Sequence, residues 1–287
     1  MDVLLLGADG MLSNDLVLTA PPNIRVLSLT HDDLDITDYD RLRSAVAGTT
    51  ARVVVNAAAY TAVDEAESAR DLAFRVNGEA VGVLATAAAA AHVRVVHFST
   101  DYVFDGTATA PYAEDVPPRP LSVYGETKRE GEIRLLSSTA QYLVIRTQWL
   151  FGGHGRSFVK TIRDAASAGR PLRVVNDQTG RPTWSRDLAT ATWKLITGDA
   201  TGVFHVANSG IATWYELALA VVREAGYAVP VVPCSTGEFA RPARRPQYSA
   251  LDTSRYERWS GERLRHWSAA LEEFLRDSAS AIGRTVK

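Results

Sequence analysis

The 287-residue chain has a single cysteine, no excess of charge of one sign and no long apolar run. Cys234 has no partner for an internal disulfide, so nothing in the sequence requires an oxidising compartment. With 31 Lys and Arg against 33 Asp and Glu, the formal net charge is -2. That charge gives no general attraction to nucleic acid or to an anionic membrane surface. The expected partner is therefore a small molecule.

Targeting and membrane segments are also missing from the pattern. Residues Met1 to Gly10 carry no basic region and only a short apolar run before a glycine, which is typical of a buried strand and not of a signal peptide. The alanine-rich stretch from Ala80 to Val96 is interrupted by polar residues and is too short for a bilayer span. We expect a cytoplasmic protein that makes no membrane contact.

What the sequence does contain is a repeated order of short β-branched run, turn and helical stretch. This order is typical of successive βαβ units, and nearly continuous apolar strands suit a parallel sheet covered on both faces. An alanine-rich core helix is predicted over Ala66 to Ala91. The predicted fold class is α/β, with a doubly wound parallel sheet. The five expected strands are Val3–Leu6, Ile24–Leu29, Val53–Val55, Val93–Phe98 and Tyr142–Ile145.

The pattern becomes less regular after Trp149, where glycines interrupt it. Residues 172–177 and 203–208 read as further strands, and 213–226 as a helix.

A glycine turn follows the first strand. Glycines at this place let backbone N–H groups at a helix N-terminus approach a pyrophosphate closely, as in Rossmann dinucleotide sites. Ser13 stands where the usual pattern has a third glycine. The position at the start of the sheet favours a cofactor site over a bare turn. The candidate cofactor-binding residues here are Gly7, Asp9, Gly10, Met11 and Leu12.

The end of the second strand decides between NADH and NADPH, because a carboxylate there accepts the ribose 2′-hydroxyl and repels a 2′-phosphate. No carboxylate occurs before Asp32, which favours NADPH. Thr30 and His31 can donate hydrogen bonds to a phosphate, but no arginine is near in sequence, so NADH stays open. Asp35 and Ile36 fall where the chain would pass an adenine ring.

Three residues carry the predicted chemistry. Tyr124 and Lys128 are four apart and share one face of a helix. A phenol with a pKa of about 10 is a poor acid–base catalyst at neutral pH, and a lysine cation beside it favours the phenolate. Thr100, at the end of the fourth strand, can donate a hydrogen bond to a carbonyl oxygen that becomes an alkoxide as hydride arrives.

A further candidate segment follows the third strand. Three small residues there would let a cofactor ribose lie close to the backbone, and the next residue could face the nicotinamide. The less favoured alternative is that the small residues only pack a strand end. The residues are Ala57, Ala58, Ala59 and Tyr60.

These motifs resemble the dTDP-4-dehydrorhamnose reductase family of extended short-chain dehydrogenases/reductases. The likeness runs from residue 3 to about residue 252. It rests on motifs in this order: GADGML, LDITD, NAAAYTAVDEAE, FSTDYVFDG, YGETKREGE, RTQWLFG, NDQTGRPTW and RPQYSALD.

The resemblance implies a catalytic trio of Thr100, Tyr124 and Lys128, with Tyr124 as proton donor and Lys128 also holding the nicotinamide ribose. It implies reduction of the C4 keto group of dTDP-4-dehydro-6-deoxy-L-mannose (dTDP-4-dehydrorhamnose) to dTDP-L-rhamnose by NADPH. The substrate-binding residues that it implies are Thr100, Asp101, Val103, Trp149, Arg244, Arg245 and Ser249.

The expected organisation is a dinucleotide-binding domain over residues 1–150 and about 182–212, with a smaller substrate-binding lobe over about 151–181 and 213–287. Two alternatives stay open: a related dTDP-4-keto-deoxysugar reductase of an antibiotic pathway, and a non-catalytic NADP-binding regulatory subunit. A homodimer is also left open. No paired histidine or cysteine spacing indicates a metal, and no Gly-x-Ser-x-Gly segment indicates a serine hydrolase.

Overall fold

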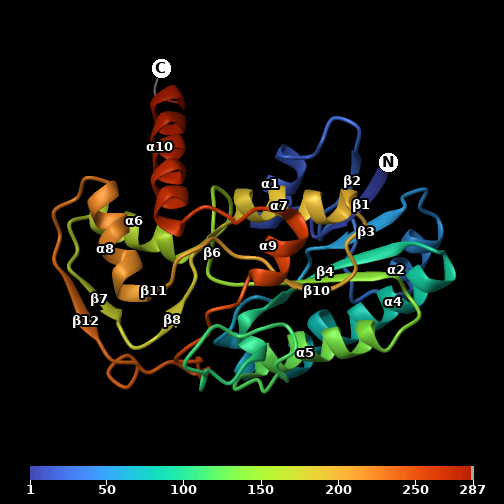
Figure 1. Ribbon diagram of the computed structural model, residues 1–287, viewed down its shortest axis with the longest axis horizontal. Helices are drawn as coiled ribbons and strands as arrows, with labels where there is room; N and C mark the ends of the chain where they lie inside the picture. Colours follow the sequence, from blue (N-terminus) through green and yellow to red (C-terminus); the bar gives the residue numbers. More distant parts are fainter. Residues whose placement is uncertain (286–287) are drawn as a thin grey trace.

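The computed structural model describes residues 1–285 (Figure 1). One half of the molecule is built on a six-stranded sheet in the order β10-β5-β4-β3-β1-β2, and every pairing in it is parallel. The predicted doubly wound α/β fold is confirmed, and the ends of the five expected strands shift by only one or two residues. The strands are β1 (Asp2–Leu6), β2 (Arg25–Leu29), β3 (Val53–Asn56), β4 (Arg94–Thr100), β5 (Tyr142–Thr147) and β10 (Gly202–His205).

Helices cover both faces of this sheet, which explains why its strands are apolar at nearly every position. In β1, Val3 and Leu5 enter one core, whereas Leu4 and Leu6 enter the other. The first core is closed by α1 (Met11–Leu18) and α7 (Ser185–Thr197), and the second by α2 (Tyr39–Ala47), α4 (Ala80–Ala90) and α5 (Val123–Leu136).

A helix is present over Arg70 to Ala90 of the predicted Ala66–Ala91 stretch, but it is not the single uninterrupted helix expected from the sequence. The chain instead forms a short 3₁₀ turn, η1 (Glu65–Glu67), then α3 (Arg70–Phe74), one π turn, η2 (Arg75–Glu79), and α4. The π turn accommodates a buried Asn77, whose amide binds the backbone N–H and C=O of Tyr60 at 2.9 and 3.0 Å. π turns of this kind are frequent at functional sites.

The second half of the molecule has its own core, packed from α6, α8, α10 and short strands (Figure 1). The helix expected over 213–226 is present as α8, with a capping box formed by Thr213 and Glu216. Of the residues described, no helix is long and apolar enough to cross a membrane. The elements are β6 (Leu150–Phe151), α6 (Phe158–Ser167), β7 (Leu172–Val175), β8 (Thr179–Gly180), β9 (Thr183–Trp184), β11 (Ala212–Thr213), α8 (Trp214–Glu224), β12 (Val231–Cys234) and α10 (Trp267–Thr285).

One helix of the C-terminal segment returns to the sheet. In α9 (Ser254–Ser260), Tyr256 is buried in the core between the sheet, α1 and α7. The C-terminal part of the chain therefore contributes to one core of the sheet, through α9, and to the core of the second half, through α10.

Candidate active site

The glycine turn after β1 is shaped for close backbone approach. Gly7 has a φ of 73°, and a Cβ on it would lie 2.7 Å from the backbone N of Ala58. Helix α1 begins after Gly10 with no side-chain cap and no acidic residue in its first turn, so its N-terminal N–H groups have no competing carboxylate. Ser13, in place of the third glycine, is buried and donates a hydrogen bond to the Gly7 carbonyl at 2.7 Å.

A cavity of about 350 Å³ opens beside this turn. Its size falls within the range of small-molecule pockets. Thr37, Leu72 and Val76 also line it and were not found from the sequence. Met11, Leu12 and Thr30 are not among its lining residues, and Leu12 is buried in the sheet core. The predicted cofactor residues that line the cavity are Gly7, Asp9, Gly10, His31, Asp35, Ile36, Ala57, Ala58, Ala59 and Tyr60.

The turn after β2 differs from the expectation in one respect. The Thr30 hydroxyl and backbone N–H both donate to the Asp33 carboxylate, at 2.7 and 2.9 Å. These hydrogen bonds lower the pKa of Asp33, so the carboxylate is charged and Thr30 has no donor left for a phosphate. Arg41 reaches the same turn from α2 and donates to the Asp33 carbonyl at 2.5 Å. Sequence proximity alone did not reveal this cation.

Tyr124 and Lys128 lie one helical turn apart on α5, which Ser122 caps through the Gly125 N–H. Burial raises the pKa of Tyr124 to about 12, although a hydrogen bond with Thr100 opposes the rise. Lys128 is not among the groups that shift the pKa of Tyr124, contrary to the expected lowering. The Lys128 ammonium instead donates to the Phe98 carbonyl at 2.6 Å.

Tyr124 stands between the two sides of the site. Its ring lies edge-on to Tyr102, with 5.5 Å between centroids, and it belongs to the same apolar cluster as Tyr60. Tyr60 lines the cavity beside the glycine turn, whereas Tyr102 lines a second cavity. Tyr124 lines neither cavity itself but lies next to a residue of the second and shares a cluster with a residue of the first.

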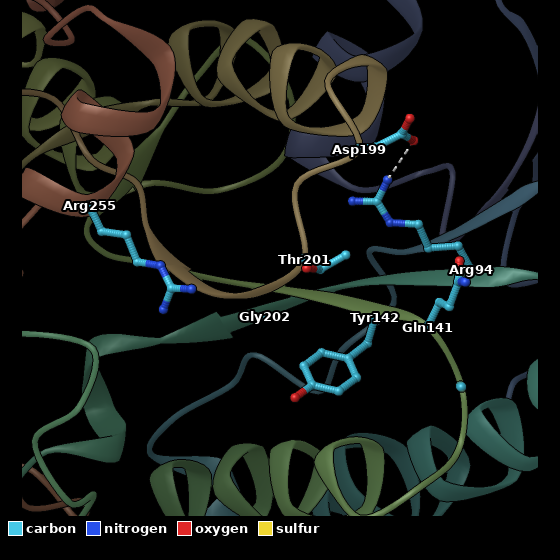
Figure 2. A pocket seen from close by; sticks show the side chains of 8 residues that line it. Arg94, Gln141, Tyr142, Asp199, Thr201, Gly202 and Arg255 are labelled. Carbon is cyan, nitrogen blue, oxygen red and sulfur yellow. Dashed lines mark ion pairs between the residues drawn. The ribbon is translucent and has the colours of Figure 1, made fainter.

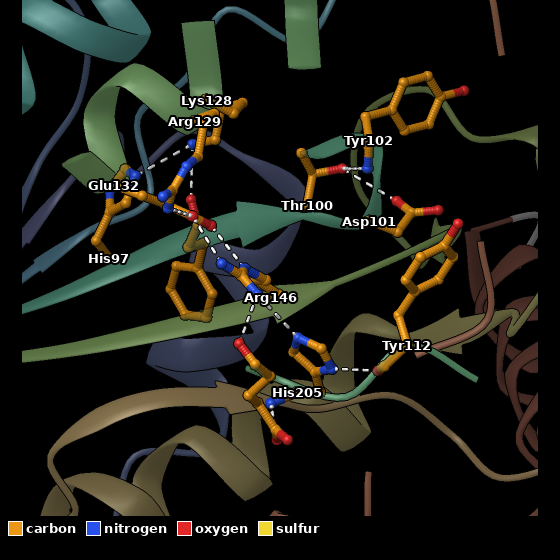
Figure 3. Close-up of polar contacts among 12 residues, drawn as sticks. His97, Thr100, Asp101, Tyr102, Tyr112, Lys128, Arg129, Glu132, Arg146 and His205 are labelled. Atoms are coloured by element: carbon orange, nitrogen blue, oxygen red, sulfur yellow. Dashed lines mark hydrogen bonds and ion pairs between the residues drawn. The ribbon is translucent and has the colours of Figure 1, made fainter. Parts of the chain in front are cut away.

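The strand-end residues beside Tyr124 form a buried polar group (Figure 3). The Thr100 hydroxyl donates to an Asp101 carboxylate oxygen at 3.0 Å and accepts the Tyr102 N–H. Burial raises the pKa of Asp101 to about 7. Ser249 is also buried, and Val103 is fully enclosed in an apolar cluster, so neither lines the second cavity.

The second cavity, of about 550 Å³, lies in the other half of the molecule and is bordered by arginines and aromatic rings. Arg244 and Arg245 both line it, as the substrate prediction requires. Arg245, however, makes a bidentate ion pair with Asp64, with both N–O distances 2.9 Å. Asp64 was missed by sequence reasoning. Other lining residues not found from the sequence are Tyr102, Phe158, Trp214, Thr236 and Phe239.

Trp149 lies behind this second cavity. It adopts a positive φ of 49° and stacks on Trp214, with 3.6 Å between ring centroids and 8° between planes. Gly180 leaves room for the indole, because a Cβ there would lie 2.5 Å from it. Trp214, and not Trp149, lines the cavity itself.

A third cavity, of about 800 Å³, lies at the opposite end of the sheet (Figure 2). Arg94, Tyr142 and Gly202, which line it, begin β4, β5 and β10. Parallel sheets bind ligands at the carboxyl ends of their strands, so this cavity is not the candidate site. Among the described residues, no cluster of three or more His, Cys, Asp or Glu is arranged to hold a metal ion.

One turn beyond Lys128, a buried ion pair joins α5 to β5 (Figure 3). Arg146 makes two hydrogen bonds to Glu132, at 2.8 and 2.9 Å, and the two side chains are 2% and 0% exposed. Burial is the largest influence and acts to raise the pKa of Glu132, but the hydrogen bonds and charge of Arg146, with the hydrogen bonds of Ser99 and Arg129, together outweigh it and the pKa is lowered. The carboxylate is therefore charged beneath the site.

A doubly wound sheet with a glycine turn, a strand-end threonine and a Tyr-x-x-x-Lys helix defines an oxidoreductase of the extended short-chain dehydrogenase/reductase class. The family model for the RmlD substrate binding domain matches residues 1–280, so the chain belongs to that family. The resemblance to dTDP-4-dehydrorhamnose reductases is thereby confirmed.

Three relatives illustrate the similarity. A dTDP-4-dehydrorhamnose reductase of Streptomyces griseus is 45% identical over 99% of this chain and 96% of its own length. A probable dTDP-4,6-dihydroxy-2-methyloxan-3-one 4-ketoreductase of Streptomyces antibioticus is 44% identical, over 97% and 96%. The crystal structure of the dTDP-4-dehydrorhamnose reductase of Bacillus anthracis in complex with NADP is 34% identical with a TM-score of 0.93, over 96% of this chain and 99% of that chain.

Proposed function

We propose that this chain uses NADPH to reduce the C4 keto group of dTDP-4-dehydrorhamnose, giving dTDP-L-rhamnose. The observation that carries the proposal is the position of Tyr124, between a residue of the glycine-turn cavity and a residue of the arginine-lined cavity. A dinucleotide in the first and a nucleotide sugar in the second would bring their reactive ends to the phenol.

The residues of the glycine turn fit a dinucleotide. The uncapped N-terminus of α1 would bind the pyrophosphate, and Ala57 to Ala59 offer no side-chain obstacle to the ribose. When bound, the reduced nicotinamide supplies the hydride. NADPH is favoured over NADH because the Bacillus anthracis relative binds NADP. Arg41 also brings a cation to the turn after β2, where it offsets the charge of the Asp33 carboxylate.

Tyr124 supplies the proton. A pKa of about 12 keeps the phenol protonated at neutral pH, yet it remains a stronger acid than an alkoxide's conjugate alcohol, so it can protonate the C4 oxygen. Thr100 lies against Tyr124, and its hydroxyl would orient the same oxygen by turning its hydrogen from Asp101 to the substrate. Lys128 would hold the nicotinamide ribose from the floor of the site.

Arg244 and Arg245 would face the diphosphate, since both line the second cavity, and an arginine fork matches phosphate oxygens. Trp149 would contribute through the stack with Trp214, which forms part of that cavity's wall. Asp101, Val103 and Ser249 would act from beneath the substrate, through the buried group around Thr100.

A second candidate substrate is a related dTDP-4-keto-deoxysugar, and the name of the Streptomyces antibioticus relative favours it. The motifs that carry the chemistry are the same for both sugars.

The division into a dinucleotide-binding domain (1–150 and about 182–212) and a substrate-binding lobe (about 151–181 and 213–287) is supported by the core of the second half, which is separate from the two cores on the faces of the sheet. Residues 254–260 are an exception, because α9 packs on the sheet side. A cytoplasmic location and a homodimer belong to the same proposal, and cell fractionation and analytical ultracentrifugation would test them.

The decisive assay mixes the purified protein with dTDP-4-keto-6-deoxyhexoses and NADPH or NADH, follows nicotinamide absorbance, and identifies the product sugar. Tyr124→Phe should lower kcat by about 10²–10⁴-fold, the usual contribution of general acid catalysis, with NADPH affinity retained. Tyr142→Phe, at the opposite end of the sheet, is the matched control. Near-normal turnover of Tyr124→Phe would remove Tyr124 from its role, and no sugar-dependent oxidation would favour a regulatory subunit.

A further inference from the structure

A line of buried hydrogen bonds runs from Ala58, which follows β3 and lines the cavity beside the glycine turn, to Lys128. The Ala58 N–H donates to Asn56 Oδ1 at 3.2 Å, and Asn56 Nδ2 lies 3.3 Å from His97 Nδ1. His97 Nε2 in turn lies 3.4 Å from Lys128 Nζ (Figure 3). Asn56 and His97 are paired residues of β3 and β4, and both are buried, as is Lys128. Neither Asn56 nor His97 has a part in the chemistry described above.

The backbone N–H of Ala58 sets the direction of this line. Because that N–H must meet an oxygen, Oδ1 of Asn56 faces Ala58 and the amide NH₂ faces His97. A donor from Asn56 requires His97 Nδ1 to be the unprotonated nitrogen. In a neutral imidazole the proton then resides on Nε2, which faces Lys128.

An N–H aimed at Lys128 favours the neutral amine, which has a lone pair to accept it, over the ammonium, which has none. The Phe98 carbonyl, 2.6 Å from Nζ, can take a hydrogen from either form. Burial lowers the pKa of His97 well below its ordinary value, which agrees with a neutral ring. Burial also lowers the pKa of Lys128 to about 8, close to physiological pH.

We propose that Asn56 and His97 are positioning residues that fix the Lys128 side chain and shift its proton equilibrium toward the amine, so that the backbone of Ala58, which lines the cofactor cavity, controls the charge of the active-site lysine. The inference deepens the proposed function, because it needs Lys128 to serve the reductase reaction. It goes beyond the catalytic trio by naming what sets the state of its lysine.

The other groups around Lys128 act in known directions. From its own helix, Glu132 opposes the effect of burial and raises the pKa of Lys128, and Glu132 is itself held by Arg146 and Arg129. Tyr124, one turn earlier, is protonated and carries no charge at neutral pH. From β4, His97 is the titratable side chain bonded to Nζ.

The first test needs neither cofactor nor activity. ¹⁵N NMR of the cofactor-free protein, with the histidine signals assigned through the β4 backbone, reports which ring nitrogen of His97 carries the proton. We expect the neutral Nε2–H form from about pH 6 to pH 8. An Nδ1–H form or a charged imidazolium would overturn the proposal, even if the reductase activity proves correct.

The second test reverses the donor and acceptor roles along the hydrogen bonds from residue 56 to Lys128. In Asn56→Asp, one carboxylate oxygen still accepts a hydrogen bond from the Ala58 N–H. The other accepts a hydrogen bond from His97, whose proton then resides on Nδ1. The unprotonated Nε2 becomes a hydrogen-bond acceptor for the Lys128 ammonium. The pKa of Lys128 should rise, and the alkaline limb of the kcat profile should move up by about one pH unit or more. The dissociation constant of NADPH at neutral pH should change by less than the roughly tenfold effect that the one-unit shift of the alkaline limb represents.

Asn77→Asp is the matched control, since Asn77 is also a buried asparagine bonded to the same loop but faces Thr127 and not His97. It should leave the alkaline limb in place. An unmoved limb in a folded Asn56→Asp, or equal movement in both variants, would refute the inference. If Asn56→Asp does not fold, the NMR result on the unaltered chain decides. If no dTDP-sugar is reduced at all, the proposed function fails while the NMR outcome still stands.

Discussion

The buried pair of Glu132 and Arg146 offers a quantitative test of what supports the active-site helix. Arg146→Met removes one partner and leaves the Glu132 carboxylate buried and largely unpaired. Removing one member of a fully buried ion pair costs about 3–5 kcal/mol, because the remaining charge has lost both water and partner. Arg129 still contacts Glu132 at 2.8 Å, so the lower end of that range is expected.

The double variant Glu132→Leu with Arg146→Met should be far less affected. Replacing both charges by apolar groups removes the desolvation penalty together with the attraction, and such replacements are often neutral or stabilising. The coupling between the two sites should therefore reach about 2 kcal/mol or more. The surface pair of Arg134 and Glu130, also on α5, is the control and should contribute below about 1 kcal/mol.

Thermal unfolding provides the assay. At about 2–4 °C per kcal/mol, Arg146→Met should lower Tm by at least about 6 °C, and the double variant should recover most of that loss. Circular dichroism of each variant at low temperature would verify that the overall helix content is retained. Strictly additive effects, or a double variant worse than either single one, would refute the reasoning from desolvation.

Three further predictions concern the site. Gly7→Ala should cost at least about 1–2 kcal/mol in backbone strain and weaken NADPH binding, measured by fluorescence titration, because its Cβ meets Ala58; unchanged affinity would contradict a role for the turn. Burial raises the pKa of Asp101 to about 7, so the stability conferred by its proton is complete below the unfolded value of 3.8 and is lost as pH rises through 7. Asp101→Asn should therefore lose less Tm than the unaltered protein between about pH 5 and pH 8, and parallel Tm curves would contradict this. Asp64→Asn should raise the KM for the sugar nucleotide several-fold with kcat nearly retained, because it releases Arg245 and its loop; an unchanged KM would show that the pair does not position the substrate side.

Local patterns predicted the parts of the molecule that depend on nearby residues. The apolar runs revealed five strands, and the spacing of Tyr124 and Lys128 placed both on α5 because a helix repeats within a turn. The glycine turn could likewise be predicted, because Gly7 and Gly10 come directly after an apolar strand.

Local sequence patterns could not predict contacts between segments that are distant in the sequence. Asp64 and Arg245 are 181 positions apart, and neither is unusual in its local sequence. The contact of Asn56 with His97 depends on the register of β3 against β4, and the approach of His97 to Lys128 depends on where α5 crosses the sheet. The π turn at Arg75–Glu79 is set by the contacts of Asn77, so alanine-rich helix propensity pointed to an uninterrupted helix.

The outermost strand next to β5 has a consequence for biosynthesis. β10 pairs with β5 only after the chain has left the sheet at residue 147 and returned at residue 202. During translation the growing sheet therefore presents the six-residue β5 as its open edge, whereas the finished sheet presents the shorter, four-residue β10. Open edges template aggregation, so chaperone protection in that interval matters more here than for a sheet whose strands emerge consecutively. A fragment of the protein ending near residue 150 would lack β10, so β5 would remain the edge strand of its sheet.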